Sequence, residues 1–553
     1  MISYVHGASS VPFIGETIGT YFDEIARRFP NRDAVVSRHQ GVRLSYADLR
    51  RSTDEFARGL LALGVEKGDR VGIWSTNNAE WVIAQFATAK IGAILVNVNP
   101  AYRTAEVSYA LQQSGVGLLL TQVRHKTSEY VRMLAEVRPA LPALRQIVLI
   151  GDDEPDVALE ALRWNDVVAR APEVAPDTLA AKAALCEFDD PINIQYTSGT
   201  TGFPKGATLS HHNILNNGFF IGEGCGYSEL DRVCVPVPFY HCFGMVLGTL
   251  ACVTHGSAIV IPAPTFDATA TLETVQAERC TSLYGVPTMF IAELSLPNFG
   301  DYDLSSLRTG IMAGSPCPVE VMKRVQTEMH MPEVTICYGM TETSPVSFQT
   351  GKHDSIEKRT TTVGRVHPHA ECKIVDEQGR VVPVGTPGEL CTRGYLVMLG
   401  YWNDPENTAK AIDAARYMHT GDVAVMDAEG YVNISGRIKD MVIRGGENVY
   451  PREIEEFLYT HPAIKDVSVI GVPDEKYGEE LCAWIVPKEG GTVDVESVRA
   501  FCQGKIAHYK IPRYVKIVDA FPMTVTGKIQ KFKMRETSTA ELGLEAAGKI
   551  VTA

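Results

Sequence analysis

The sequence predicts an α/β protein with a large N-terminal domain of mostly parallel sheets and helices, a small antiparallel β subdomain, and a small α+β C-terminal domain. Strand-like apolar runs alternate with helical patterns through much of the chain. Near residue 366, short turn-bounded runs replace this alternation. At 553 residues the chain also exceeds what one hydrophobic core usually supports, so at least two domains are expected.

The first expected elements follow one another as helix, strand, helix and strand. A helix is expected to begin within 44–49, and a short apolar strand follows at 71–74. The next helix runs to about Lys90, and the strand after it covers 92–97. Strand, helix and strand at this spacing form a βαβ unit, which places both strands parallel in one sheet. The same alternation returns through 258–312.

The later elements define the domain boundary. The runs after residue 366 indicate a more antiparallel, β-rich subdomain over about 366–436. The segment 437–440 is charged and expected to be exposed, so we place the boundary there. The N-terminal domain is thus expected to span 1–436. The C-terminal domain, 441–553, alternates strand and helix patterns in a compact α+β unit.

Composition limits the classes of function. The formal net charge of −14 argues against a nucleic-acid binder, and twelve singly scattered cysteines without zinc-site spacing indicate thiols in a reducing compartment. The N-terminus lacks the features of a secretory signal. The most apolar window, 242–264, is interrupted by polar residues, so we expect a buried helix and strand rather than a transmembrane segment. A cytoplasmic location is predicted, while peripheral membrane contact and homo-oligomerisation remain open.

The segment Tyr196–Gly206 carries the strongest chemical signal. It combines three glycines, four Ser or Thr side chains and one lysine directly after an apolar run. Glycines let backbone amides approach an anion, and the hydroxyls and Lys205 add donors, which is the composition of a polyphosphate cradle. The spacing is not the Walker pattern, because no glycine immediately precedes the lysine and no Ser or Thr follows it. A plain surface loop between a strand and a helix is the alternative.

Two further motifs and one basic segment suggest ligands. In Tyr338-Gly-Met-Thr-Glu342, the carboxylate of Glu342 could bind a magnesium ion that bridges phosphates, and Tyr338 could stack on an adenine. The alternative is a strand end with a capping threonine. Taken alone, the pair Gly421-Asp422 is typical of a turn. The segment 505–535 contains eight basic residues and one acidic residue, which gives it a local net charge of +7 that suits phosphate groups.

In their order along the chain, these motifs resemble those of the adenylate-forming (ANL) superfamily, which includes acyl-CoA synthetases, peptide-synthetase adenylation domains and beetle luciferases. The resemblance runs from about Tyr196 to Lys531 and more loosely upstream to residue 15. It implies that the sheets of the large domain are stacked. It also implies that the C-terminal domain is mobile and turns about a hinge at 437–440, with Lys439 as the hinge residue.

The resemblance also implies the roles of the ATP site. Lys528 would contact the substrate carboxylate and the α-phosphate, while Thr341, Glu342 and Lys205 would act in catalysis, with Glu342 as the magnesium ligand. The residues implied to bind the phosphates, adenine and ribose are Thr197, Ser198, Gly199, Thr200, Thr201, Gly202, Gly314, Ser315, Tyr338, Gly339, Asp422 and Arg437.

Two further groups of residues are implied for the other substrates. After domain rotation, Gly445, Gly446 and Glu447 would line the tunnel for the pantetheine of coenzyme A. The acyl pocket would include His241, Phe243, Pro345 and Val346. On the sequence alone, His241 is interpreted as a core histidine. The resemblance implies that His241 forms a wall or gate of the acyl pocket and does not act as an acid–base group.

The resemblance implies an ATP-dependent fatty acid–CoA ligase. A carboxylate would attack the α-phosphate of magnesium ATP to give an acyl-adenylate and pyrophosphate, and the thiol of coenzyme A would then displace AMP. The segments 339–348 and 4–7 most resemble the medium-chain branch, and the pocket candidates include no fixed cation, so medium- to long-chain acids are favoured. The alternatives are an adenylating enzyme that serves a carrier protein, a luciferase-like oxygenase and an aryl-acid ligase. A non-catalytic binding module would be expected to lack Lys528 or Glu342, and both are present.

Overall fold

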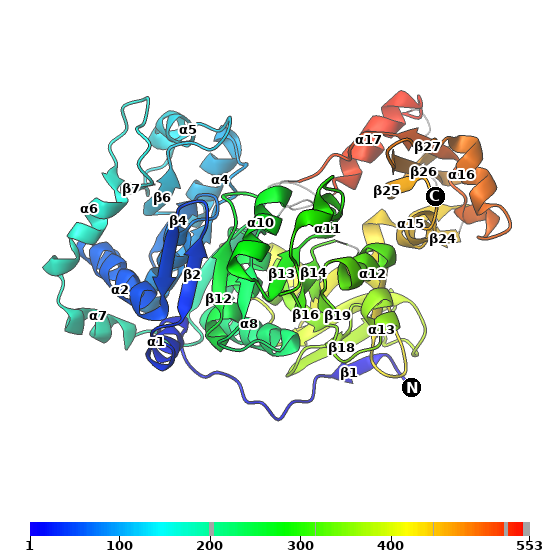
Figure 1. The fold of residues 1–553 in the computed structure, drawn as a ribbon. Coiled ribbons are helices and arrows are strands. Elements are labelled where there is room, and N and C mark those ends of the chain that lie inside the picture. The colour runs from blue at the N-terminus through cyan, green and yellow to red at the C-terminus, as the bar shows by residue number, and fades with distance from the viewer. Residues whose placement is uncertain (198–203, 316, 446, 525–528, 546–553) are drawn as a thin grey trace.

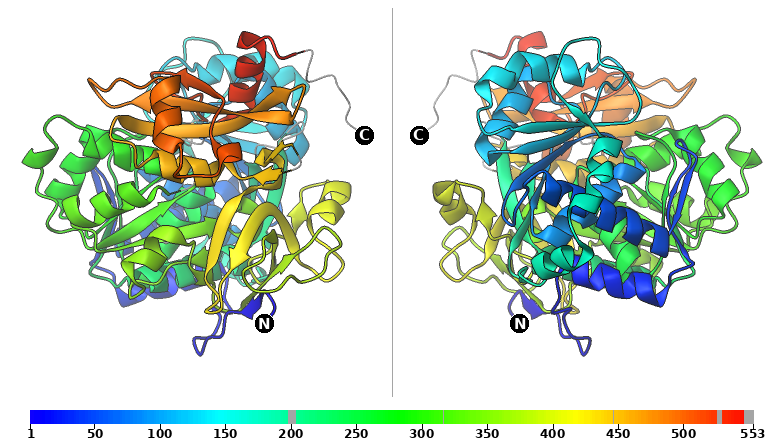
Figure 2. Two further views of the ribbon diagram at one scale, coloured as in Figure 1. Left: turned by 90° about the vertical axis from the view of Figure 1, so that its right-hand side faces the viewer. Right: turned by 90° about the vertical axis from the view of Figure 1, so that its left-hand side faces the viewer.

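The structure is a computed structural model that describes residues 1–197, 204–315, 317–445, 447–524 and 529–545. Within these ranges the strands form four sheets. Two large mixed sheets and one antiparallel sheet make up the N-terminal part, and the fourth sheet belongs to a C-terminal unit at one side of the molecule (orange to red in Figure 1). Figure 2 shows this unit lying above the green and yellow parts of the chain.

The first large sheet has the strand order β20-β10-β9-β5-β4-β6-β7-β8. Its strands run parallel from β9 to β8, whereas β10 is antiparallel to both β9 and β20. The expected βαβ unit is therefore confirmed, with β4 and β5 adjacent and parallel. The strands are β4 (Arg70–Trp74), β5 (Ile94–Asn97), β6 (Leu118–Gln122), β7 (Gln146–Ile150), β8 (Leu162–Arg163), β9 (Pro191–Thr197), β10 (Lys205–Ser210) and β20 (Gly400–Tyr401).

The second large sheet has the order β17-β16-β15-β14-β13-β11-β12-β2-β3. Its central strands, from β2 to β15, are parallel, and its edges are antiparallel. The strands are β2 (Asp33–Ser37), β3 (Val42–Ser45), β11 (Arg232–Cys234), β12 (Ala258–Ile261), β13 (Ser282–Gly285), β14 (Thr309–Ala313), β15 (Glu333–Gly339), β16 (Val346–Gln349) and β17 (Arg365–Val366).

A layer of helices lies between the two large sheets. One buried apolar cluster joins Ile73 of β4 and Ile259 of β12 to helix α3 (Ala79–Ile91), all of whose residues except Glu80 are buried. A helix that is buried all round must be covered on both sides, so the sheets are stacked as expected. The other members of this layer are α1 (Ile18–Arg28), α2 (Tyr46–Ala62), α8 (His211–Cys225), the π-helix η3 (Phe243–Leu250) and α9 (Ala251–His255).

Further helices cover the outer faces of both sheets. The first sheet is covered by α4 and α5, and the second by α10, α11 and α12. The bounds are α4 (Thr104–Ser114), α5 (Tyr130–Val137), η1 (Arg138–Ala140), α6 (Trp164–Ala169), η2 (Ala171–Glu173), α7 (Pro176–Ala183), α10 (Ala268–Glu278), α11 (Pro287–Leu294), η4 (Phe299–Asp301), α12 (Val319–Glu328), η5 (Thr341–Thr343) and α13 (Ile356–Thr361).

The structure confirms the expectation for the apolar window 242–264. It folds as η3, α9 and β12, and almost all of it is buried. Across the described ranges, no helix combines the length and apolar character that a bilayer crossing requires. Each of the twelve cysteines is a free thiol.

The third sheet is antiparallel throughout, which confirms the β-rich subdomain. Its order is β1-β18-β19-β21-β22, and β1 comes from the N-terminus, which the sequence did not suggest. In Figure 1, the blue segment that joins β1 to α1 runs along the outside of the molecule. The elements are β1 (Tyr4–His6), β18 (Ala370–Val375), β19 (Gly388–Gly394), α14 (Pro405–Ala411), β21 (Met418–Met426) and β22 (Val432–Arg437).

The C-terminal unit has a core of its own. Buried apolar residues from Val442 onwards cluster with one another, whereas Ile434 belongs to a cluster of the N-terminal part. We therefore propose the domain boundary at 437–440. The elements are η6 (Ile438–Asp440), β23 (Val442–Arg444), β24 (Glu447–Val449), α15 (Pro451–Leu458), β25 (Ile464–Asp474), β26 (Gly478–Pro487), α16 (Val495–Cys502), η7 (His508–Lys510), β27 (Tyr514–Ile517) and α17 (Lys531–Glu541).

One buried carboxyl group in the N-terminal core predicts a pH-dependent stability. Glu293 on α11 is 1% exposed, and neither carboxyl oxygen has a hydrogen-bond partner among the described residues. Burial therefore raises the pKa of Glu293 well above its ordinary value of 4.5. Because the folded state holds this proton more tightly than the unfolded state, stability is lost as pH rises above 4.5 towards the folded pKa.

We expect Glu293→Gln to be more stable than the wild type at neutral pH, by on the order of 1–3 kcal/mol, and equally stable near pH 4.5. Thermal unfolding midpoints of both proteins across this pH range measure the difference. Glu273→Gln, which changes an exposed carboxylate on α10, is the matched control. A stability difference between Glu293→Gln and the wild type that does not grow with pH would contradict a protonated buried Glu293.

Candidate active site

The predicted phosphate loop joins two antiparallel strands. Thr197 at the end of β9 lies opposite Lys205 at the start of β10, and the Oγ1 of Thr197 donates to the carbonyl oxygen of Lys205 at 3.4 Å. The alternative of a loop between a strand and a helix is therefore wrong. The predicted residues Ser198, Gly199, Thr200, Thr201 and Gly202 lie outside the described residues, so their roles remain predictions.

Lys205 is positioned by the segment around β20 and α14. Its Nζ donates to Asn407 Oδ1 at 3.1 Å and lies 5.2 Å from the centre of the Tyr401 ring. A cation at this distance from an aromatic face is attracted to it. The ammonium group of Lys205 is thus held between two residues that lie about 200 positions later in the sequence.

The predicted magnesium ligand contacts the same tyrosine. Glu342 is 6% exposed, and its Oε1 accepts a hydrogen bond from the hydroxyl of Tyr401 at 2.8 Å. Burial, with the nearby Glu342 carboxylate, raises the pKa of Tyr401, so the phenol stays a donor. The backbone amide of Met398 also donates to the carbonyl oxygen of Glu342 at 2.9 Å. Glu342 thereby joins η5, which follows the second sheet, to the edge of the first sheet.

Sequence reasoning missed Tyr401 and Asn407. Both lie in the run Gly400–Asn407, which is rich in aromatic, turn-forming and capping residues. Asn407 also donates through Nδ2 to Asp404 Oδ2 at 2.7 Å, and Asp404 caps α14. The density of polar and aromatic residues in this run was the available signal, but nothing in the run itself identifies Lys205 and Glu342 as their partners.

A second group of contacts brings the adenine and ribose candidates together. The hydroxyl of Tyr338 donates to Asp422 Oδ2 at 2.5 Å, and Arg437 Nε lies 3.3 Å from Asp422 Oδ1. Asp422 and Arg437 are opposite each other on the paired strands β21 and β22. Burial raises the pKa of Asp422, and the charge of Arg437 opposes that shift. Arg437 therefore pairs with Asp422.

Two glycines of the predicted adenine site have backbone reasons for their identity. Gly314, at the end of β14, has φ +91°, a conformation that side chains strongly disfavour. A Cβ on Gly339, at the end of β15, would lie 1.6 Å from the carbonyl oxygen of Pro345. The neighbouring strands β14 and β15 thus end in close-packed turns, with Ser315 and Tyr338 beside them.

The acyl-pocket candidates occur in two pairs. The backbone amide of Phe243 donates to His241 Nδ1 at 3.1 Å, where the π-helix η3 begins. Pro345 and Val346 follow η5, and the side chain of Asn217 on α8 binds both the amide (3.0 Å) and the carbonyl (2.8 Å) of Val346. Phe243 and Val346 are both buried in the cluster between the large sheets. A π-helical turn often marks a functional site, which fits these positions.

The remaining predicted residues lie at the C-terminal unit. Lys439 is exposed within η6, which directly follows β22. Gly445 has φ +60° and precedes β24, which begins at the exposed Glu447. Gly446 and Lys528 lie outside the described residues. Among the described residues, no hydrogen bond joins Lys439, Gly445 or Glu447 to Tyr401 or Asp422, so their roles remain predictions.

Ion pairs change the interpretation of the basic segment 505–535. Five of its eight basic residues pair with carboxylates elsewhere in the C-terminal unit, which offsets most of the local charge. The segment therefore does not present a broad cationic face. The paired residues are Lys510 with Glu453, Arg513 with Asp474, Lys516 with Glu541, Lys531 with Glu455 and Arg535 with Glu479.

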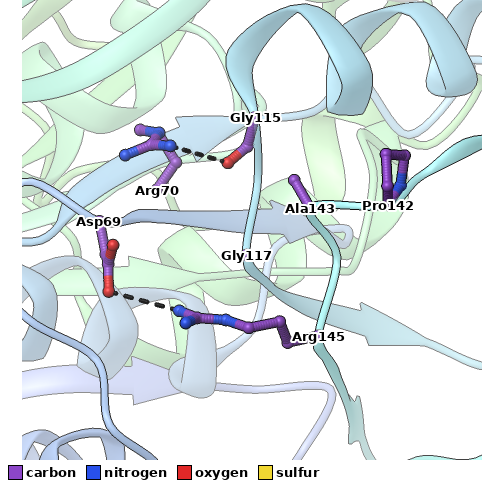
Figure 3. Close-up of a pocket in the computed structure, with 7 residues that line it drawn as sticks. All are labelled: Asp69, Arg70, Gly115, Gly117, Pro142, Ala143 and Arg145. Atoms are coloured by element: carbon purple, nitrogen blue, oxygen red, sulfur yellow. Dashed lines mark hydrogen bonds and ion pairs between the residues drawn. The ribbon is translucent and has the colours of Figure 1, made fainter.

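A surface pocket on the first sheet lies at the opposite edge from these groups. It has a volume of about 320 Å³ and is lined by residues at or just before the starts of β4, β6 and β7 (Figure 3). Arg70 donates to the carbonyl of Gly115 at 3.1 Å, and Arg145 lies 3.5 Å from Asp69. These are the amino ends of parallel strands, whereas the phosphate loop follows the carboxyl end of β9. Ligands of open α/β sheets bind at the carboxyl ends, so we place the active site there.

Comparison with known proteins agrees with this arrangement. The family model for AMP-binding enzymes matches residues 22–402, and that for the AMP-binding enzyme C-terminal domain matches 453–528. The putative acyl-CoA synthetase YngI of Bacillus subtilis (strain 168) is 49% identical over 97% of this chain and 99% of its own length. The mitochondrial medium-chain acyl-CoA ligase ACSF2 of Danio rerio is 45% identical over 98% of this chain and 91% of its own. The crystal structure of the anthranilate CoA ligase AuaEII with anthranoyl-AMP has a TM-score of 0.87 at 27% identity, covering 96% of this chain and 99% of that one.

The fold, the grouping of the site residues and the two matched models show that the chain belongs to the AMP-binding enzyme family. Within the family it groups with the acyl-CoA synthetases, AMP-forming ligases that join a carboxylic acid to the thiol of coenzyme A. The resemblance expected from the sequence is thereby confirmed.

Proposed function

We propose that this acyl-CoA synthetase activates medium- to long-chain fatty acids with magnesium ATP. The observation that supports the proposal is that Lys205 and Glu342 both contact Tyr401, because a cation of the kind that binds phosphate then lies near a carboxylate of the kind that binds magnesium. The relatives named as medium-chain acyl-CoA ligases support the substrate class.

Three described residues of the site, and Lys528, have a proposed part in the first half-reaction. Glu342 fits a magnesium site because its carboxylate is buried and Tyr401 donates to Oε1, so Oε2 can serve as a ligand. A magnesium ion there would neutralise charge on the phosphates. Lys205 would bind the departing phosphates, and Asp422 would accept hydrogen bonds from the ribose hydroxyls. The substrate carboxylate is already an anion, so no general base is needed, and Lys528 would orient its attack.

The second half-reaction needs a different face of the C-terminal unit. We propose that this unit rotates about Lys439, which is exposed in a short 3-10 turn between two separate cores. A hinge of this kind absorbs a backbone change with little loss of packing. Gly445, Gly446 and Glu447 would then line the path of the pantetheine thiol, which displaces AMP.

The choice of acid is proposed from the acyl-pocket candidates. Phe243 and Val346 are buried and apolar, and none of the four candidates carries a fixed positive charge. An apolar tail fits this surface better than a second carboxylate does. An aryl acid is the second candidate, since the anthranilate CoA ligase shares the fold over almost the whole chain.

Measurement of AMP release tests the proposal directly. The full chain would receive magnesium ATP with acids from acetate to palmitate, with benzoate and malonate added, in the presence and absence of coenzyme A. We expect coenzyme-dependent AMP release that peaks at mid-length fatty acids. A peak at benzoate would show that the enzyme activates aryl acids and not fatty acids. If the enzyme catalyses pyrophosphate exchange but coenzyme A does not increase AMP release, the proposed transfer to coenzyme A would be wrong. An enzyme that passes the acyl group to a carrier protein would then be favoured.

The contact between Tyr401 and Glu342 yields a separate prediction. We expect Tyr401→Phe to lower kcat/KM about tenfold and to raise the magnesium concentration needed for half-maximal activity, because Glu342 loses its charge-assisted hydrogen bond while the aromatic ring beside Lys205 remains. Steady-state kinetics over a magnesium series measure both effects.

The matched control is Tyr4→Phe, which removes a phenol–carboxylate bond of similar length, 2.7 Å to Glu371, in the antiparallel sheet. This variant should keep wild-type kinetics. Equal loss of activity in both variants would show that Tyr401 supports folding and does not position Glu342.

A further inference from the structure

Three metal-ligand side chains meet on one face of the antiparallel sheet, outside the active-site groups described above. Cys391 on β19 lies directly opposite His419 on β21, and Glu389 is two residues before Cys391. Side chains two residues apart on a strand point to the same face, and the register of the β19–β21 pairing shifts between Glu389 and Cys391, which leaves all three side chains close together. Leu390, which lies between Glu389 and Cys391, packs on the other face of the strand in the apolar cluster that also contains Cys372 and Ile434.

The distances among these side chains suit a small ion. His419 Nδ1 is 2.8 Å from Glu389 Oε2 and 3.5 Å from Cys391 Sγ, and the three ligand atoms all lie within 4.8 Å of one another. Ligand atoms around tetrahedral zinc, with bonds of about 2.0–2.3 Å, are separated by roughly 3.3–3.8 Å. A small outward movement of Glu389, whose side chain is partly exposed, would bring the group to that geometry.

Neighbouring groups already orient two of the three side chains. The other ring nitrogen, His419 Nε2, lies 3.6 Å from Asp413 Oδ2, an arrangement that resembles the carboxylate–histidine–metal contacts of zinc proteins. The backbone amide of Gly421 donates to Glu389 Oε1 at 3.1 Å. Cys391 is fully buried, whereas the His419 side chain is 32% exposed, so an ion could enter from the solvent side.

We propose that Glu389, Cys391 and His419 bind one zinc-class divalent cation, with water as the fourth ligand. Thiolate and imidazole ligands select such ions over Mg²⁺, so this site is separate in chemistry from the one proposed at Glu342. Binding releases the thiol proton of Cys391 to solvent, together with any proton on His419 Nδ1. Without a metal, the hydrogen bonds that His419 makes to Cys391 and Glu389 raise the pKa of His419 to about 10, and the ion must displace that proton.

The position of the site gives it a route to the nucleotide. Gly421, which donates to Glu389, immediately precedes Asp422. A cation that draws Glu389 away from Gly421 would shift the backbone that presents Asp422, and we expect a higher KM for ATP in the loaded enzyme. This consequence rests on the proposed ribose role of Asp422, but the binding site itself does not.

Cobalt(II) titration of the full chain tests the site, with nucleotides left out because they chelate metals. We expect one equivalent of Co²⁺ to bind with a thiolate-to-cobalt charge-transfer band, and Zn²⁺ to displace it in the presence of excess Mg²⁺. Cys391→Ser should abolish the band, and His419→Gln should weaken binding at least about tenfold. Cys372→Ser, a buried cysteine of the neighbouring strand whose side chain belongs to the opposite core, should behave as the wild type.

Two results would overturn the proposal: no saturable binding by the wild type, or a band that survives in Cys391→Ser. Either would leave the group as an ion pair between His419 and its carboxylates. If circular dichroism shows that Cys391→Ser does not fold, Glu389→Gln replaces it, because the Glu389 side chain is only partly buried. That variant should bind cobalt more weakly while it keeps the thiolate band, and unchanged affinity would count against the site. If the metal binds as expected but the loaded and metal-free enzymes have the same KM for ATP, only the coupling to Asp422 is rejected.

Discussion

Glu342→Gln is expected to lower kcat/KM for acyl-CoA formation by about 10²–10³, the cost of losing a charged group that stabilises a phosphoryl-transfer transition state. The amide keeps the shape of the side chain and can still accept from Tyr401, so the local packing should persist. It cannot neutralise a metal ion as a carboxylate does. The loss should therefore lie in the use of magnesium ATP.

The measurement is AMP and pyrophosphate formation over a magnesium series, with the melting temperature as a check on folding. Glu333→Gln, at the other end of β15, is the matched control and should retain activity. If Glu342→Gln performs as well as this control, Glu342 is not the magnesium ligand. Partial rescue at high magnesium concentration would support the assignment, since a weakened site refills as the ion concentration rises.

Lys528→Ala is expected to separate the two half-reactions. Formation of the acyl-adenylate should fall by about 10²–10³, because an ammonium group that contacts the carboxylate and the α-phosphate acts only in that step. Conversion of a supplied acyl-adenylate by coenzyme A should continue at nearly the wild-type rate. In the proposed cycle, Lys528 has left the active site by then.

The two rates are measured separately, by pyrophosphate exchange and by thioester formation from synthetic acyl-adenylate. Lys533→Ala is the matched control, since Lys533 is an exposed lysine on α17 that lies over the ring of Phe532. Equal loss of both half-reactions would contradict the proposed rotation. Unchanged adenylation would remove Lys528 from the catalytic residues.

Much of the fold could be predicted from the sequence because the signals are local. Apolar runs and the helical pattern that ends near Lys90 predicted β4, α3 and β5, and in the structure Asn78 caps α3. The change of pattern near residue 366 predicted the antiparallel subdomain, and the five-strand sheet confirms it. These features depend on residues a few positions apart, so a linear sequence displays them. The pairing of β1 with β18 had no such signal, because its strands are separated by more than 360 residues.

The candidate site likewise has features that the local sequence predicted and features that depend on distant residues. The sequence by itself determined which residue types are present and in what order: a glycine-rich loop with Lys205, the carboxylate Glu342 and the acidic turn at Asp422. Only the tertiary structure decided their partners, Tyr401 for Glu342 at a separation of 59 residues and Tyr338 for Asp422 at 84. It also brought Cys391 beside His419, although the cysteine spacing gave no metal pattern. The physical reason is that hydrogen bonds and charge pairing act over a few ångströms, and strand order determines which distant residues come within that range.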